Sequence, residues 1–200
     1  MTDPATPLSH LAARLRALPP SLGPVRLVAV DGHAGSGKTT FAARLATALG
    51  GAPVLHTDDL ASHAALFDWS ARLTEQVLRP LEHGRTAHYA VYDWHARHFA
   101  GRHALPPDPV VIVEGVGAGR RALRPRLACL LWMELAERDS WRRGRRRDGP
   151  EMAAFWKGWV PAERAHFAAD PSRPYADALV LQRAASSEGY RVLPGPGGTF

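Results

Sequence analysis

The chain has 200 residues, of which 46% are hydrophobic, and this suits one compact domain with a real core. Its net charge is +6, and its single cysteine, Cys129, excludes an internal disulfide. Cys129 falls in an apolar run, so we expect a core position in a reducing cytoplasm. No stretch approaches the roughly 18 apolar residues that a membrane span needs. The N-terminus carries Asp3 and has no long apolar segment, so we expect no signal peptide.

Apolar runs and helical periodicities alternate along the chain. A short amphipathic helix is predicted over residues 11–18, before Pro19 and Pro20. The expected strands lie near residues 25–30, 53–57, 88–92, 110–113, 127–134 and 178–181. The expected helices cover residues 38–49, 70–83, 137–147 and 151–168. The run 110–113 is continuously apolar, which is typical of a strand in a parallel sheet that helices cover on both faces.

A phosphate-binding loop follows the first strand. Residues 32–39 read Gly-His-Ala-Gly-Ser-Gly-Lys-Thr, a full match to the P-loop (Walker A) pattern G-x-x-x-x-G-K-[ST]. Between a strand and a helix, such glycines turn backbone N–H groups toward phosphates, and the helix N-terminus adds partial positive charge. Lys38 can reach the β- and γ-phosphates, and the Thr39 hydroxyl can bind Mg²⁺. The predicted nucleotide-binding residues are Gly32, Ala34, Gly35, Ser36, Gly37, Lys38, Thr39 and Thr40.

Acidic residues follow two further strands, at the carboxyl ends where ligands bind in open α/β sheets. Asp58 and Asp59 come after the run 52–57. One carboxylate there can orient an acceptor hydroxyl and take its proton, and its neighbour can bind Mg²⁺-bound water or substrate. The alternative for both is a helix N-cap. Glu114 ends the strand 110–113 like the acid of a Walker B strand, and the sequence leaves open whether it serves Mg²⁺ or the acceptor.

Arginines are concentrated between residues 138 and 147. They are Arg138, Arg142, Arg143, Arg145, Arg146 and Arg147. Nucleic-acid binding and a solvated basic helix face are two interpretations of such a cluster. Because the chain has a P-loop, we favour a third, a lid at about residues 138–150 that closes over ATP. Residues 191–200 contain a Pro- and Gly-rich run and are expected to be a flexible tail, which leaves residues 1–190 as a single domain.

Aromatic residues and histidines receive structural interpretations. Spacings of three and four put Met152, Phe155, Trp156 and Trp159 on one helix face, which indicates core packing or a dimer contact. For Trp69 and Trp94 we favour core packing over stacking on a substrate ring. No pair of the ten histidines has a convincing metal-ligand spacing, so we expect no zinc site.

Taken in order, these segments resemble the uridine kinase group of P-loop nucleoside and metabolite kinases over roughly residues 25–182. The matching segments are Gly32 to Thr40, Thr57-Asp58-Asp59-Leu60, Phe67-Asp68, Tyr92-Asp93-Trp94 with Arg97, Glu114-Gly115, Arg143 with Arg147-Asp148, and Tyr175-Ala176-Asp177 after a helix with Pro161-Ala162-Glu163. The P-loop alone is specific only for nucleotide binding, whereas the ordered set is much more specific for this superfamily. The resemblance implies a P-loop NTPase fold of three α/β/α layers, with a central mostly parallel sheet and a helical, arginine-bearing lid.

The resemblance also implies ATP and Mg²⁺, with Asp58 as the base and with Arg143 and Arg147 as lid arginines. It further implies that Asp68 and Tyr92 line the acceptor pocket.

The chain departs from the family pattern in two places. The aromatic pair that follows the catalytic aspartate in the family is replaced by Asp59-Leu60-Ala61. Arg97 stands in the region of the family's base-reading histidine, with His95 and His98 close by. An anionic or differently shaped acceptor could use Arg97, so the resemblance does not assign uridine itself.

The sequence therefore predicts a cytoplasmic kinase that transfers the γ-phosphoryl group of ATP to a hydroxyl of a nucleoside or related metabolite. The predicted catalytic residues are Lys38, Asp58, Arg143 and Arg147, the metal ligands are Thr39 and Glu114, and the substrate-binding residues are Asp59, Asp68, Tyr92, Arg97 and Glu114. Two other classes remain: a kinase of nucleic-acid 5′ ends or RNA-associated NTPase, for which 200 residues leave little room, and a non-catalytic ATP-binding module. We expect no membrane partner and leave a homo-oligomer open.

Overall fold

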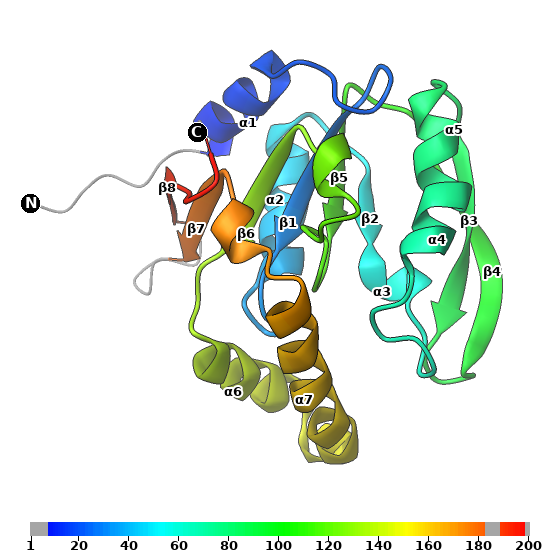
Figure 1. Ribbon diagram of the computed structural model, residues 1–200, viewed down its shortest axis with the longest axis vertical. Helices are drawn as coiled ribbons and strands as arrows, with labels where there is room; N and C mark the ends of the chain where they lie inside the picture. The colour runs from blue at the N-terminus through cyan, green and yellow to red at the C-terminus, as the bar shows by residue number, and fades with distance from the viewer. Residues whose placement is uncertain (1–7, 183–188, 199–200) are drawn as a thin grey trace, which may run out of the picture.

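The computed structural model describes residues 8–182 and 189–198, in which six strands form one sheet with helices on both faces (Figure 1). In order across the sheet, the strands are β2 (Val54–His56), β5 (Val110–Glu114), β1 (Arg26–Asp31), β6 (Cys129–Met133), β7 (Ala178–Gln182) and β8 (Tyr190–Pro194). All neighbouring strands pair in parallel except β7 and β8, which are antiparallel. This is the three-layer α/β fold that the sequence predicted, with a mostly parallel central sheet.

Side chains of the central strands alternate between two cores. Leu27 of β1 belongs to one core and Val28 to the other, and every residue of β5 and β6 is buried. Such continuous burial is the property of a strand covered by helices on both faces. Helices α1 (Leu8–Ala17) and α2 (Lys38–Ala48) pack on the face of Val28. Cys129 lies in the same core and is 1% exposed, as predicted.

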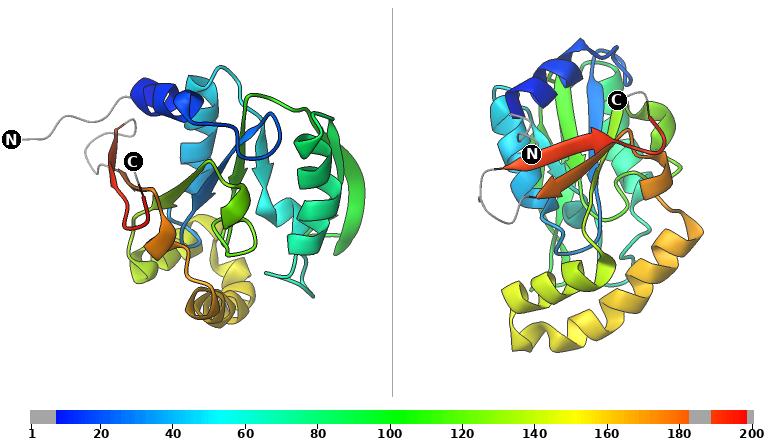
Figure 2. Two further views of the ribbon diagram at one scale, coloured as in Figure 1. Left: turned by 45° about the horizontal axis from the view of Figure 1, so that its top comes forward. Right: turned by 90° about the vertical axis from the view of Figure 1, so that its left-hand side faces the viewer.

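The opposite face is covered by one helical segment and flanked by a separate hairpin (Figure 2). The segment consists of α4 (Ser70–Leu73), the π-helical η1 (Thr74–Leu78) and α5 (Arg79–Glu82). β3 (Ala87–Asp93) and β4 (His98–Leu105) pair only with each other. The sequence predicted a strand near β3 but missed β4, because nearly all of its side chains are exposed or half-buried and no apolar run marks it.

The carboxyl ends of the parallel strands carry the remaining helices. The short α3 (Thr57–Leu60) follows β2 directly. α6 (Glu137–Asp148), η3 (Pro150–Met152) and α7 (Ala153–Ala169) project beyond the sheet at this end, at the bottom of Figure 1. The single turns η2 (Arg124–Arg126) and η4 (Arg173–Tyr175) precede β6 and β7. Within the described residues, no helix has both the length and the apolar character to cross a membrane.

Strand β8 differs from the sequence prediction, which assigned residues 191–200 to a flexible tail. β8 pairs along its full length with β7, and the amide of Gly195 then donates to the carbonyl of Asp177 at 2.8 Å. Residues 191–194 therefore form a strand where the sequence predicted a tail, and residues 199–200 lie outside the described part of the chain. The run is short and ends in prolines and glycines, so its pairing depends on β7, which the local sequence does not reveal.

Candidate nucleotide and acceptor site

The P-loop leaves β1 and leads directly into α2. Gly35 and Gly37 have φ angles of 84° and 98°, a left-handed conformation that glycine adopts without strain. No side chain caps α2, which leaves the first N–H groups of this helix available to an anion. The local geometry is therefore that of a phosphate cradle.

Lys38 lies across this loop. Its Nζ donates to the carbonyl oxygens of Gly32 at 2.9 Å and His33 at 3.0 Å, and the side chain is 7% exposed. These two bonds hold the ammonium group within the loop, and a phosphate oxygen can replace a carbonyl as its partner.

A cavity of about 350 Å³ lies between the P-loop, the carboxyl ends of β2 and β5, and α6. Its lining residues are Ala34, Gly35, Gly37, Lys38, Thr39, Thr40, Asp58, Glu114, Gly115, Val116, Arg143, Gly144, Arg147 and Trp159. Every predicted catalytic residue and both predicted metal ligands are among them, although they come from four separate parts of the chain. The structure therefore brings these side chains together in one cleft.

Glu114 joins the P-loop to β2. Its Oε1 accepts hydrogen bonds from Thr39 Oγ1 at 3.1 Å and from His56 Nδ1 at 2.5 Å. The bond to Glu114 raises the pKa of His56, although burial acts in the opposite direction. Sequence reasoning missed His56, which no motif marks; only the parallel register of β2 and β5 sets it opposite Glu114.

Asp58 and Asp59 lie in the first turn of α3. Asp58 opens into the cleft and Asp59 is half-buried. The pKa of Asp58 is raised, first because the surrounding protein reduces the hydration of its carboxylate and second because Glu114 carries the same charge. Burial also raises the pKa of Asp59. Neither residue caps α3, whose N-cap is His56 and has no side-chain cap bond. A raised pKa suits a carboxylate that must take a proton from a hydroxyl.

The hairpin of β3 and β4 holds α3 in place. Trp94 Nε1 donates to the backbone carbonyl of Asp58 at 3.2 Å, and the Tyr89 hydroxyl donates to Asp59 Oδ2 at 3.3 Å. Trp94 thus does more than pack, because its indole N–H orients the backbone of α3. The buried Trp69 does pack in the core, as predicted, with the guanidinium of Arg120 3.6 Å from its ring centroid.

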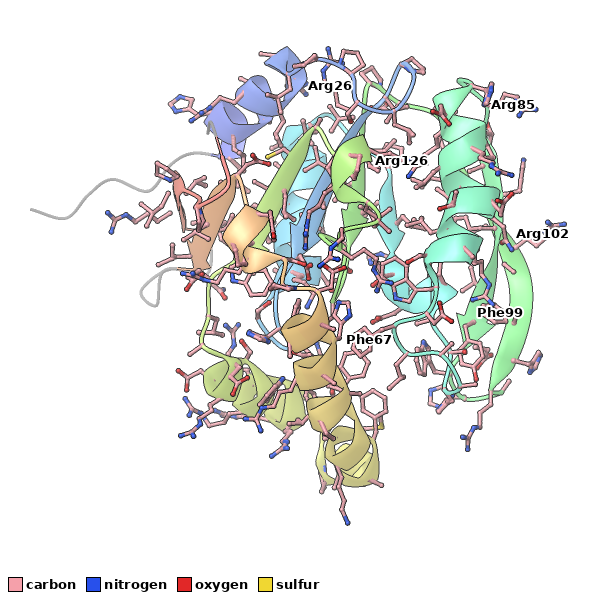
Figure 3. The ribbon with its side chains drawn as sticks, viewed as in Figure 1. Arg26, Phe67, Arg85, Phe99, Arg102 and Arg126 are labelled. Carbon is pink, nitrogen blue, oxygen red and sulfur yellow. The ribbon has the colours of Figure 1, made fainter. Side chains whose placement is uncertain are left out.

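The other predicted acceptor residues do not line the cavity. The Tyr92 hydroxyl is 3.0 Å from His63 Nδ1, and the side chain is buried. Asp68 is exposed next to Phe67, whose ring stacks on His166 of α7 with 4.6 Å between centroids (Figure 3). Arg97 lies in the turn between β3 and β4 with a φ angle of 59° and is also exposed.

Helix α6 approaches the P-loop at backbone distance. A Cβ atom placed on Gly35 would lie 2.1 Å from the carbonyl oxygen of Ser140 and 2.7 Å from the amide nitrogen of Gly144. A Cβ atom on Gly144 would in turn lie 2.4 Å from the Trp156 ring. Two glycines thus allow the P-loop, α6 and α7 to pack on one another, and the motif pattern marked only the first of them.

The arginines of α6 divide between two sides. Arg143 and Arg147 line the cavity, where Arg143 Nη2 also donates to Gln182 Oε1 at 3.0 Å. Arg138, Arg142 and Arg145 border a separate hollow between α6 and α7. The predicted lid arginines are therefore the members of the cluster that face the cleft.

Helix α7 buries much of its predicted aromatic face. Trp156 and Trp159 form a core cluster with Trp141 and Val116, against which Phe155 packs. Met152 is the exception, because it belongs to η3 before α7 begins and is 38% exposed. Met152 is therefore not part of the core, because the chain follows 3₁₀ rather than α geometry after Pro150. The alternative of a dimer contact for this face stays a prediction.

Asp31 is a site residue that sequence reasoning missed. Its fully buried carboxylate accepts hydrogen bonds from the amides of Gly32 at 2.7 Å, Gly117 at 2.9 Å and Gly119 at 2.9 Å. It thereby ties the start of the P-loop to the loop that follows β5. The available signal was an acid between an apolar strand and the first P-loop glycine.

Comparison with solved structures gives two kinase-like neighbours. A possible uridine kinase from Bacillus stearothermophilus has a TM-score of 0.63 and 20% identity, and the match covers 86% of this chain and 96% of that one. A candidate fructose transport system kinase from Silicibacter sp. TM1040 has a TM-score of 0.55 and 23% identity, covering 69% of this chain and 79% of that one. At these identities the likeness shows the fold alone: the chain shares the three-layer α/β fold of these two proteins.

Comparison with curated proteins gives a more limited match. The chain is 31% identical over 111 residues to the inorganic pyrophosphatase TTM2 of Arabidopsis thaliana. The matched segment covers 50% of this chain. The match spans only 16% of that protein's length, so its activity does not transfer. No protein-family model matches the chain.

Proposed function

We propose that this protein is an ATP-dependent kinase that transfers the γ-phosphoryl group to a hydroxyl of a nucleoside or related small metabolite. The observation that carries the proposal is that Lys38 of the P-loop and Asp58 line the same cavity. A module that only bound nucleotide would need the phosphate cradle but no carboxylate with a raised pKa beside it.

The P-loop and α6 together bind and stabilise the phosphates in this proposal. Backbone N–H groups and Lys38 hold the triphosphate, and Lys38 exchanges its carbonyl partners for phosphate oxygens. Arg143 and Arg147, on the α6 side of the cavity, stabilise the charge that develops on the transferred group. Closure of the arginine-bearing segment excludes water and limits hydrolysis of ATP.

The residues at the end of β5 fit a magnesium ion. The Thr39 hydroxyl and the Glu114 carboxylate are 3.1 Å apart, and oxygen ligands of this kind are those that Mg²⁺ prefers. Thr39 and Glu114 would hold the ion, which when bound neutralises charge on the β- and γ-phosphate oxygens. The bond from His56 orients the Glu114 carboxylate for this task.

Asp58 acts on the acceptor in this proposal. It orients the hydroxyl and takes its proton, while Asp59, held by Tyr89, lies beside it in α3. Tyr92, Asp68 and Arg97 do not line the cavity, so in this proposal they contact only a part of the acceptor that extends beyond it. The names of the two structural neighbours, both of them kinases, support phosphoryl transfer to a small molecule.

Two variants separate nucleotide binding from acceptor chemistry. Lys38→Ala should lower turnover by a factor of about 100 or more, because it removes a charge worth about 3 kcal/mol in the transition state. Asp58→Asn keeps the shape of the side chain, so it should bind ATP as wild type does yet release no acceptor-dependent ADP. Calorimetry with ATP and Mg²⁺ gives the affinity, and ADP release is measured against a panel of nucleosides, sugars and related metabolites.

Asp59→Asn serves as the matched control, with an expected effect that is milder than that of Asp58→Asn. If Asp59→Asn is the inactive variant and Asp58→Asn turns over normally, the roles are reversed. ATP binding by wild type without ADP release for any acceptor would instead favour a non-catalytic module. Phosphorylation of oligonucleotide 5′ ends, with steeply salt-dependent binding, would favour the nucleic-acid class.

A further inference from the structure

The function proposed above leaves a buried carboxylate unused. Glu163 of α7 is fully buried, and its two oxygens lie within hydrogen-bond distance of donors on three separate elements. Oε1 is 2.7 Å from His33 Nδ1 and 3.1 Å from Trp141 Nε1. Oε2 is 2.5 Å from Trp159 Nε1 and 3.2 Å from the amide nitrogen of Ala34.

All the partners of Glu163 are hydrogen-bond donors, so the group that they surround must accept hydrogen bonds through both of its polar atoms. Indole and backbone N–H groups only donate, and His33 Nδ1 must carry a proton to bond a carboxylate. A carboxamide of the same shape would turn an NH₂ group toward one of these donors. An ionised carboxylate accepts hydrogen bonds from all of these donors. The carboxylate needs them in turn, because a buried charge without partners would be strongly destabilising.

The partners of Glu163 belong to the nucleotide cleft or to its walls. Ala34 lines the cavity, and the next residue, Gly35, meets the backbone of α6 directly. The His33 ring is enclosed by aromatic rings, with centroid distances of 5.5 Å to Trp132 and 5.1 Å to Phe167. Glu163 therefore joins the P-loop, α6 and α7 at one point behind the cradle.

We infer that Glu163 is a positioning residue, which holds P-loop residues 33–35 and the first half of α6 in their phosphate-binding arrangement before nucleotide arrives. It does so through hydrogen bonds to His33, Ala34 and Trp141, without touching the nucleotide. The inference rests on the proposed nucleotide site but is independent of the acceptor. Within the predicted lid at about residues 138–150, Glu163 makes the first half of α6 a fixed wall of the site.

The test combines nucleotide affinity with hydrogen exchange in the full chain. Glu163→Gln should weaken binding of ATP with Mg²⁺ by about 10-fold or more while circular dichroism stays that of a folded protein. Without nucleotide, exchange should become faster in residues 33–36 and 138–144 of this variant. Glu137→Gln is the matched control: within the described residues this α6 carboxylate forms an ion pair with the exposed Arg164 and does not contact Glu163, so affinity and exchange should stay at wild-type values.

A second variant covers the case in which Glu163→Gln does not fold. Trp141→Phe removes one donor from α6 and leaves the carboxylate ionised, so it should weaken nucleotide binding about 3-fold and speed exchange at residues 33–36. Wild-type affinity and exchange in either folded variant would overturn the inference. If the wild-type protein itself binds no ATP, the proposed function fails, while the exchange comparison still decides whether Glu163 orders the loop.

Discussion

The carboxylates of Asp31, Asp58 and Glu163 show how local surroundings divide similar side chains between structure and chemistry. Asp31 accepts three backbone N–H groups, and Glu163 accepts side-chain donors and an amide of the P-loop. Asp58 instead opens into the cavity, and its surroundings raise its pKa. The first two are held in one geometry by fixed donors, whereas Asp58 is free to act on a ligand.

Glu163 should make the stability of the fold depend on pH. Burial raises the pKa of Glu163, but the bond from His33 and the charge of Lys38 outweigh it and hold the pKa below its ordinary value of 4.5. Its contribution to stability is therefore fully present above pH 4.5 and is lost as the pH falls through the lower pKa of the folded state. Glu163→Gln should lower the free energy of unfolding by about 2 kcal/mol at neutral pH, and by less in acid.

Urea unfolding of wild type and Glu163→Gln between about pH 3 and pH 7 measures the difference in their free energies of unfolding. The contributions of the other titrating groups are common to both proteins and cancel in this difference. A difference that stays constant or grows as the pH falls would show that the carboxylate is not the stabilising form.

At the scale of elements, the arrangement of the P-loop, α6 and α7 depends on residues that lack a side chain. Gly35 meets the backbone of α6, and Gly144 meets the ring of Trp156. The same contact orients α6 so that Arg143 and Arg147 face the cavity while Arg138 faces the outer hollow. The arginines of α6 therefore lie on two sides of the same helix, and only one side faces the cavity.

Substitution of Gly144 should disturb this contact. The added Cβ of Gly144→Ala would lie 2.4 Å from the packed Trp156 ring, so α6 must shift. We expect a loss of about 1–3 kcal/mol of stability and weaker ATP binding. Gly158→Ala in α7 is the control: a Cβ there meets nothing within 4 Å, and alanine should stabilise the helix by about 0.5–1 kcal/mol. Denaturant unfolding that finds the two variants equally stable would contradict the close contact.

At the scale of the whole molecule, β7 and β8 extend the sheet beyond β1, β2 and β5, the strands next to the cavity. β8 covers the outer edge of β7, and its first residue, Tyr190, is 2% exposed in the core beneath α2. The Tyr190 ring meets Phe41 edge-on with 4.9 Å between centroids, while its buried hydroxyl has no hydrogen-bond partner among the described residues. Strand β8 is therefore part of the folded domain.

Two substitutions of Tyr190 test this conclusion. Tyr190→Phe removes only the unpaired hydroxyl, so the free energy of unfolding should stay equal or rise slightly. Tyr190→Ala leaves a cavity beside Phe41 and should cost about 3 kcal/mol. Thermal and denaturant unfolding provide both values. Wild-type stability of Tyr190→Ala would mean that β8 does not contribute to the stability of the domain.

The sequence by itself determined the P-loop, the alternation of strands and helices, and the acids at the strand ends. These features are local, because a P-loop is contiguous and an apolar run is visible without its partner. Parallel strands also bring their carboxyl ends to one edge, so the meeting of Lys38, Asp58 and Glu114 could be expected from the fold class.

Only the tertiary structure decided which side chains meet across elements. The pairing of His56 with Glu114 depends on strand register, and the bonds of Glu163 join residues 33–34 to a helix about 130 positions later. β4 and β8 were missed because each pairs with a neighbouring strand and neither carries an apolar run that marks it in the sequence. Such long-range contacts follow from packing, which a local pattern does not encode.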